Sequence, residues 1–275
     1  MLVSESDIET YGRDGVLHMR GALSPSWIDL IAIGIERNLR NPGPFASTYF
    51  KGNPGEFNDD YCNYETIPEY RMLLRLSPIA DIAMALTGSS SLWLFYDQIF
   101  VKEGGFSRRT PWHQDTPYFV GEGSQFISAW ITIDHLAIDE SLECVRGTHV
   151  GPMYNGNAFD ANDEAKPYYE NTNLPPPPRI EAEREKWDIV SWPTEPGDIL
   201  FHHPGIIHGG GPMREGGRRR TLALRMFGDD VRYRAVPGKP APPFPGLSES
   251  LKVGDPLRHP YFPLLRSAGA NGADR

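Results

Sequence analysis

Two histidines and one carboxylate are the residues of this chain whose types and spacing most clearly indicate chemistry. His113 and Asp115 stand two positions apart, and His208 lies far downstream, directly before three glycines. In a strand, residues i and i+2 point to the same face, so the first pair can reach one ion together. Two imidazoles and a carboxylate suit a non-haem Fe(II) and leave the opposite coordination positions open. The pattern predicts an iron site if folding brings His208 to the pair.

Short predicted strands surround these residues. Aromatic and β-branched side chains are enriched in several runs, which are separated by Pro-Gly and other turn signals. The His-x-Asp tripeptide lies between two of these runs, near the start of a strand. Short strands between tight turns indicate an antiparallel barrel or sandwich. The predicted strands are residues 91–102, 126–134, 199–201, 206–208 and 218–227.

The last predicted strand begins with three adjacent arginines. Because side chains alternate along a strand, Arg219 and Thr221 share one face, where a guanidinium and a hydroxyl can bind one carboxylate. Arg218 and Arg220 then point outward into solvent. A nucleic-acid role for this basic run is disfavoured, because the chain has 36 acidic against 27 basic residues and a net charge of −9. We therefore expect no nucleic-acid partner.

The segments 112–119 (WHQDTPYF) and 196–227 give the sequence a family resemblance that extends roughly from residue 17 to residue 227. The chain resembles the phytanoyl-CoA dioxygenase-like (PhyH) branch of the Fe(II)- and 2-oxoglutarate-dependent oxygenases. That family's motif is His-x-Asp, a distal His followed by Gly, and an Arg about eleven residues later that binds the far carboxylate of 2-oxoglutarate. Here the arginine position falls on Arg219.

The resemblance implies a fold, two cofactors and a set of site residues. The implied fold is mainly β with a helical cover, a double-stranded β-helix (jelly-roll, cupin-like) barrel. His113, Asp115 and His208 would bind Fe(II), and Arg219, with Thr221, would bind 2-oxoglutarate.

Two further positions can be carried over from relatives. Trp130 matches a tryptophan that forms a wall of the cosubstrate pocket, and Gln98 falls where relatives place a side chain that faces 2-oxoglutarate. A strand tryptophan is usually core and a strand glutamine usually faces solvent, so these alternatives stay open. Three other histidines are interpreted as turn residues: His202, which follows the strand 199–201, His203 and His149.

By resemblance, the reaction is oxidation of a small organic substrate by dioxygen, with release of succinate and CO2 from 2-oxoglutarate. Because Asp115 fills the carboxylate position, hydroxylation or a related oxidation such as desaturation is favoured over halogenation. Two alternatives stay open: a cupin-like metal enzyme that does not use 2-oxoglutarate, for which Arg219 would have no purpose, and a catalytically silent barrel that only binds. The substrate is open between an acyl-CoA and a free small molecule.

The 275 residues predict a single oxygenase domain. We expect a helical N-terminal cover at 1–90, a barrel core at 91–230 and an extended, proline-rich strap at 236–275. Proline explains why the strap cannot be regular throughout, and its last residues, 267–275, are expected to be disordered. The predicted helices span residues 24–38 and 67–86.

A polar insertion at 151–186 interrupts the barrel core and contains Tyr168 and Tyr169. Loops of this length in a compact domain are usually functional, so we expect a lid over the substrate side of the iron.

Neither a signal peptide nor a membrane span is evident, and the two cysteines, Cys62 and Cys144, are too few for a disulfide scaffold. A reducing compartment would also help to keep iron ferrous. We expect a cytoplasmic protein, a monomer or homodimer, whose partners are a small-molecule substrate and dioxygen rather than a membrane.

Overall fold

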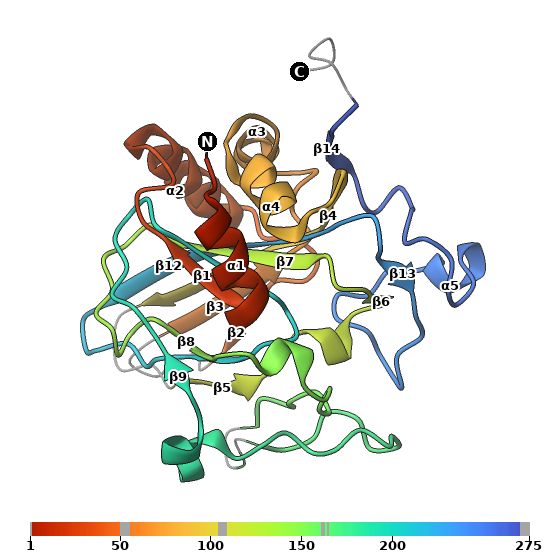
Figure 1. Cartoon of the computed structure of the whole chain (residues 1–275). Coiled ribbons are helices and arrows are strands. Elements are labelled where there is room, and N and C mark those ends of the chain that lie inside the picture. Colours follow the sequence, from red (N-terminus) through yellow and green to blue (C-terminus); the bar gives the residue numbers. More distant parts are fainter. Residues whose placement is uncertain (1, 50–55, 104–108, 161–162, 164, 270–275) are drawn as a thin grey trace.

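The computed structural model describes residues 2–49, 56–103, 109–160, 163 and 165–269. Two antiparallel sheets pack against each other and enclose an interior (Figure 1). The larger sheet has the order β1 (Val16–Met19), β10 (Ile199–His202), β7 (Phe126–Thr132), β12 (Arg218–Phe227), β4 (Ser91–Glu103), β3 (Glu56–Tyr61) and β2 (Ser47–Tyr49), and β14 (Leu264–Ser267) also pairs with β4. The smaller sheet has the order β5 (Thr110–His113), β11 (Ile207–Gly210), β8 (Leu142–Val145) and β9 (Ile189–Val190).

Four helices cover the outer face of the larger sheet (Figure 1). They are α1 (Glu5–Asp14), α2 (Pro25–Arg40), α3 (Pro68–Leu76) and α4 (Ile79–Thr87). Leu222 and Leu224 of β12 point to this side and pack in one core cluster with helix residues such as Ile35 and Leu74. The alternate residues of β12 therefore face the interior between the sheets, and Arg219 and Thr221 are among them.

The predicted helix at 24–38 is confirmed as α2, with Ser24 at its N-cap and Pro25 in its first turn. The predicted helix at 67–86 is two helices instead. Helix α3 ends at Leu76, and Pro78 is the N-cap of α4. Proline has no backbone N–H to donate and disfavours helical geometry in the residue before it, so the chain breaks at Ser77.

Residues 1–90 do more than form the predicted helical cover of the barrel. Strand β1 pairs with β10, and β3 pairs with β4, so this region also supplies strands to the larger sheet. None of the described helices is both long and apolar enough to cross a bilayer.

The C-terminal strap closes one end of the barrel. Phe244 and Phe262 pack against Phe95 of β4. The strap is less extended than predicted, since it contains a short helix, α5 (Leu247–Ser250), and strand β14. A two-stranded sheet of β6 (Gly121–Glu122) and β13 (Arg232–Tyr233) lies beside it. Ser267 belongs to β14, against the expected disorder, and residues 270–275 lie outside the described residues.

Candidate metal centre and cosubstrate pocket

His113 and His208 are brought together by strand pairing. His113 is the last residue of β5, and it lies directly opposite His208 of β11 in antiparallel register. Their ring centroids are 4.3 Å apart. The smaller sheet thus joins the two halves of a motif that are far apart in the chain.

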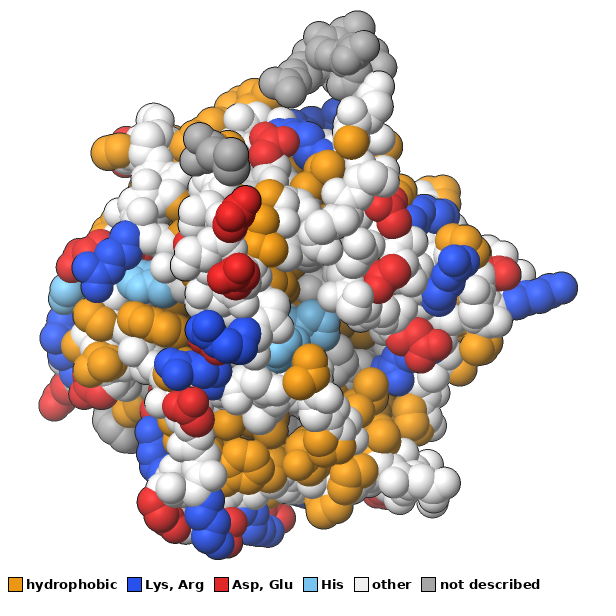
Figure 2. Space-filling model, in the orientation of Figure 1, with side chains coloured by type: hydrophobic (Ala, Val, Ile, Leu, Met, Phe, Trp, Pro, Cys, Tyr) orange, Lys and Arg blue, Asp and Glu red, His pale blue; other side chains and the backbone are white. Residues whose placement is uncertain are grey.

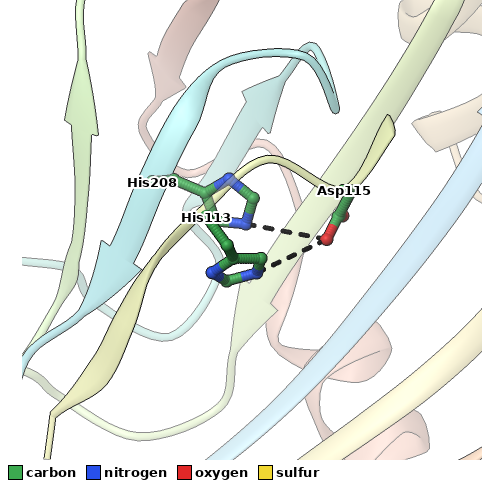
Figure 3. Close-up of side chains that lie close together, drawn as sticks. All are labelled: His113, Asp115 and His208. Atoms are coloured by element: carbon green, nitrogen blue, oxygen red, sulfur yellow. Dashed lines mark ion pairs between the residues drawn. The ribbon is translucent and has the colours of Figure 1, made fainter. Parts of the chain in front are cut away.

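Asp115 reaches the same point from a turn, not from a strand, which corrects the expected strand geometry. Strand β5 ends at His113, and Asp115 is the N-cap of a short 3-10 helix at Thr116–Tyr118. The backbone N–H groups of Asp115 and Thr116 both donate to the carbonyl of Pro204, at 2.8 and 3.2 Å. This turn directs the carboxylate toward both imidazole rings (Figure 3).

The three facing atoms form a compact donor set. Asp115 Oδ1 lies 3.5 Å from His113 Nε2 and 3.9 Å from His208 Nε2, and all three atoms lie within 4.8 Å of one another. The Nδ1 atoms lie 2.8 Å from the carbonyl of Pro111 and 3.0 Å from that of Ile206. Since a carbonyl only accepts, each Nδ1 donates in its contact, and in the neutral imidazole Nε2 is then the atom with the lone pair that a metal needs. Such backbone contacts orient metal-binding histidines, so the residues fit a divalent iron.

The electrostatics of the site favour the protonation states that metal binding needs. Burial and the neighbouring His113 lower the pKa of His208 well below its ordinary value. Burial alone would raise the pKa of Asp115, but Arg225 and the two histidines hold it well below the usual range. At neutral pH the site therefore presents a neutral imidazole and an ionised carboxylate.

Arg219 and Thr221 lie on the inner face of β12, as predicted, and both are buried. Arg219 Nη1 donates to the carbonyl of Glu140 at 2.7 Å, which fixes one side of the guanidinium. Among the described residues, neither Arg219 Nε nor Thr221 Oγ1 has a hydrogen-bond partner. Buried polar atoms are rarely left unpaired, so this face is suited to an incoming carboxylate.

A second buried basic residue, Lys102, lies beside Arg219. The two residues are direct partners in the register between β4 and β12. Burial, together with the charges of Arg219 and Arg109, lowers the pKa of Lys102 well below its ordinary value. Burial also lowers the pKa of Arg219 to about 10, against the opposing effect of Glu140. An anion bound here would favour the charged forms of both side chains and so raise their pKa values. The sequence analysis did not single out Lys102, because only the strand register places it beside Arg219.

Gly211 has a packing reason for lacking a side chain. A Cβ atom at Gly211 would collide with the carbonyl of Asp139, next to the Glu140 carbonyl that holds Arg219. Gly211→Ala should therefore lower the free energy of unfolding by about 1–3 kcal/mol, as overpacking commonly does. Gly12→Ala, in α1 with open space around it, should leave stability unchanged or slightly raised. Denaturant titrations of both variants test this, and equal stability of the two would contradict it.

Trp130 and Gln98 both face the interior, on either side of Ala223 in the register of the larger sheet. Trp130 is buried between the sheets and packs in a cluster with Ala223 and Leu200. Gln98 Nε2 donates to Asp59 Oδ1 at 2.7 Å, and burial raises the pKa of Asp59 to about 6. Their predicted contacts with a cosubstrate stay predictions.

Of the three histidines interpreted as turn residues, His202 lies in a strand instead. His202 is the last residue of β10, not a residue after it, and its buried ring lies 4.8 Å from that of His208. It is therefore an interior neighbour of the metal centre, which corrects its interpretation as a turn residue. His203 accepts a hydrogen bond from the N–H of Gly205 within a turn. His149 lies in a short 3-10 helix at Thr148–Val150, and its Nε2 is 3.2 Å from the carbonyl of Gly12 in α1.

The insertion at 151–186 lies beside the metal centre. The ring of Phe159 is 5.0 Å from that of His113, edge to face, and 47% of Phe159 is exposed. Asn157 donates to the carbonyl of Trp112, and Tyr169 donates to the carbonyl of Pro117, so the insertion is attached on both sides of the His-x-Asp turn. In Figure 2, hydrophobic side chains gather on the lower part of the face in view, where Figure 1 places the insertion.

Residues 11–221 of the chain match the sequence model of the family described as phytanoyl-CoA dioxygenase (PhyH). The chain belongs to the phytanoyl-CoA dioxygenase family. A probable phytanoyl-CoA dioxygenase of Caenorhabditis elegans is 30% identical over 203 residues, which cover 66% of this chain and 56% of that protein. The peroxisomal phytanoyl-CoA dioxygenase of Rattus norvegicus is 30% identical over 49% of this chain and 38% of its own length. The chain thus spans about half the length of the curated relatives that it matches.

Solved structures confirm the predicted double-stranded β-helix fold. The non-haem α-ketoglutarate-dependent carbocyclase SnoK from nogalamycin biosynthesis superposes with a TM-score of 0.73 at 22% identity, over 96% of this chain and 97% of that one. The epimerase SnoN, solved with Fe3+, α-ketoglutarate and nogalamycin RO, gives 0.70 at 22% identity, over 95% and 98%. Fe3+ and α-ketoglutarate, both named for the SnoN structure, correspond to the two cofactors predicted for this chain.

Proposed function

We propose that this member of the phytanoyl-CoA dioxygenase family is an Fe(II)- and 2-oxoglutarate-dependent dioxygenase that oxidises a small organic substrate. The observation that carries the proposal is the convergence of His113, Asp115 and His208, with their facing atoms within 4.8 Å of one another. All three side chains are less than 10% exposed, and each histidine presents its Nε2 to Asp115 Oδ1. These residues are the proposed iron ligands.

When bound, iron and 2-oxoglutarate together supply the oxidising power for a C–H bond, with release of succinate and CO2. The carbonyls of Pro111 and Ile206 hold the two imidazole rings in the orientation that metal binding requires. Arg219 and Thr221 bind the far carboxylate of 2-oxoglutarate through Nε and Oγ1, the two polar atoms without a partner in the described part of the chain. Trp130 forms an apolar wall of the same interior and helps to exclude water.

The buried Nε of Arg219, which has no hydrogen-bond partner among the described residues, favours this function over a cupin-like metal enzyme that needs no 2-oxoglutarate. Such an enzyme would have no use for a guanidinium placed in this way. A catalytically silent barrel is also disfavoured, because the donor set is complete and its histidines are oriented for a metal. Hydroxylation and desaturation remain alternatives for the final oxidation step.

The proposal is tested by incubating the protein with Fe(II), 2-oxoglutarate and a panel of acyl-CoA esters and free small molecules. Succinate should form only when iron, 2-oxoglutarate and dioxygen are all present, and a true substrate should accelerate its release. Substrate oxidation that proceeds without 2-oxoglutarate would favour the cupin-like alternative.

We also propose that the protein works in a reducing, cytoplasmic setting, which is compatible with its two free cysteines, Cys62 and Cys144. We propose that it is a monomer or a homodimer.

The insertion is proposed to be a lid that selects substrate, with Phe159 as its residue next to His113. Phe159→Ala should raise the amount of 2-oxoglutarate consumed per substrate oxidised severalfold, because water and misplaced substrate gain access. Metal affinity should not change, since Phe159 is not a ligand. Val150→Ala, at a side chain that is 79% exposed, is the matched control. Unchanged coupling and substrate preference in Phe159→Ala would place the selecting surface elsewhere, such as in the C-terminal strap.

A further inference from the structure

Arg225 contacts the carboxylate of the metal centre from the inner face of β12. Its Nε donates to Asp115 Oδ2 at 2.9 Å, and the two side chains are only 7% and 6% exposed. The other oxygen, Oδ1, is the one that faces the histidines, at 3.5 Å from His113 Nε2 and 3.9 Å from His208 Nε2. The two oxygens of Asp115 therefore face different partners before any metal is bound.

The surroundings of Arg225 hold its guanidinium in one place. The guanidinium carbon lies 4.6 Å from the ring centroid of Tyr96, which is its direct partner in the register with β4. Its Nη1 is buried and has no hydrogen-bond partner within the described parts of the chain. An incompletely satisfied buried arginine is a poor device for stability alone, because its desolvation is unfavourable. The position of Arg225 is better explained by its hydrogen bond to Asp115 Oδ2.

We propose that Arg225 is a positioning residue that restricts Asp115 to binding the metal through Oδ1 alone. This inference rests on the proposed iron site. A carboxylate that binds through both oxygens takes two coordination positions, whereas a carboxylate that binds through one leaves the second position open. By occupying Oδ2, Arg225 keeps that position available for 2-oxoglutarate, substrate or dioxygen.

The proposal predicts a change in the number of water molecules on a bound metal, which is measurable without catalysis. Mn(II) is added to the full chain without 2-oxoglutarate, and its bound waters are counted from the relaxation of water protons. Arg225→Met should have about one bound water fewer than the wild type, because Asp115 is then free to bind through both oxygens. Arg258→Met is the control, since Arg258 also stacks on an aromatic ring, that of Trp93, but outside the metal centre.

An Arg225→Met variant that folds and binds Mn(II) with the wild-type number of waters overturns the proposal. If the variant does not fold, a crystal structure of the Mn(II)-loaded wild type decides. One Asp115 oxygen on the metal and the other on Arg225 Nε supports the proposal, and two oxygens on the metal overturn it. Failure of the wild type to bind Mn(II) at all would overturn the iron site itself, which is a different result.

Discussion

His208→Ala should remove most of the affinity of the protein for Fe(II). The variant loses one of three proposed protein ligands, and the remaining two, His113 and Asp115, come from one short segment of the chain. Changes to residues that only support metal ligands commonly weaken binding by about 10- to 100-fold, so the loss of a ligand itself should exceed about 100-fold. Titration of the metal-free protein with Fe(II) under anaerobic conditions measures this.

The control for this prediction is His135→Ala. His135 is a largely exposed histidine that pairs with Glu195 outside the metal centre, so its loss should leave Fe(II) affinity unchanged. Wild-type metal binding by folded His208→Ala would rule out the proposed ligand set.

Arg219→Ala should strongly weaken 2-oxoglutarate binding while leaving Fe(II) binding nearly intact. Removing one partner of a buried, hydrogen-bonded charge pair typically costs about 2–5 kcal/mol. At 1.4 kcal/mol per tenfold, this corresponds to roughly a 30- to 4000-fold loss of affinity. The dependence of succinate release on 2-oxoglutarate concentration and direct calorimetric titration both measure the change.

The neighbouring arginine supplies a matched control. Arg218 points outward from the same strand and pairs with Glu36 and Glu103 at the surface. Arg218→Ala should therefore have little effect on 2-oxoglutarate binding. Equal losses in the two variants would indicate a general effect of positive charge rather than a specific carboxylate site.

The candidate ligands His113, Asp115 and His208 were singled out by their residue types and the family resemblance, and the structure brings their side chains together. The alternation of β12 separates buried Arg219 and Thr221 from Arg218, which lies at the surface. The segments that contain His113 and His208 both offer side chains that bind metals, which suggested that they share one site. The prediction of one helix at 67–86 was wrong, because the apolar periodicity continues across Pro78 while the helical backbone conformation does not.

The positions of Lys102 and Arg225 beside the candidate site could not be predicted, because they depend on pairing between distant parts of the chain. Lys102 meets Arg219 only through the register of β4 with β12. Arg225 reaches Asp115 only because the turn after β5 lies across the interior from β12. The position of Asp115 in a turn could not be predicted either. A His-x-Asp tripeptide is compatible with the end of a strand as well as with its middle.

Anaerobic titration of the wild-type protein with Fe(II) and 2-oxoglutarate together tests the central claim most directly. The account predicts a visible absorption change that requires both additions, saturates at one of each per chain and is absent from His208→Ala. It also predicts that Arg219→Ala needs a much higher 2-oxoglutarate concentration to reach the same spectrum. Binding of 2-oxoglutarate that is independent of the metal, or no spectral change in the metal-loaded wild type, would contradict the account.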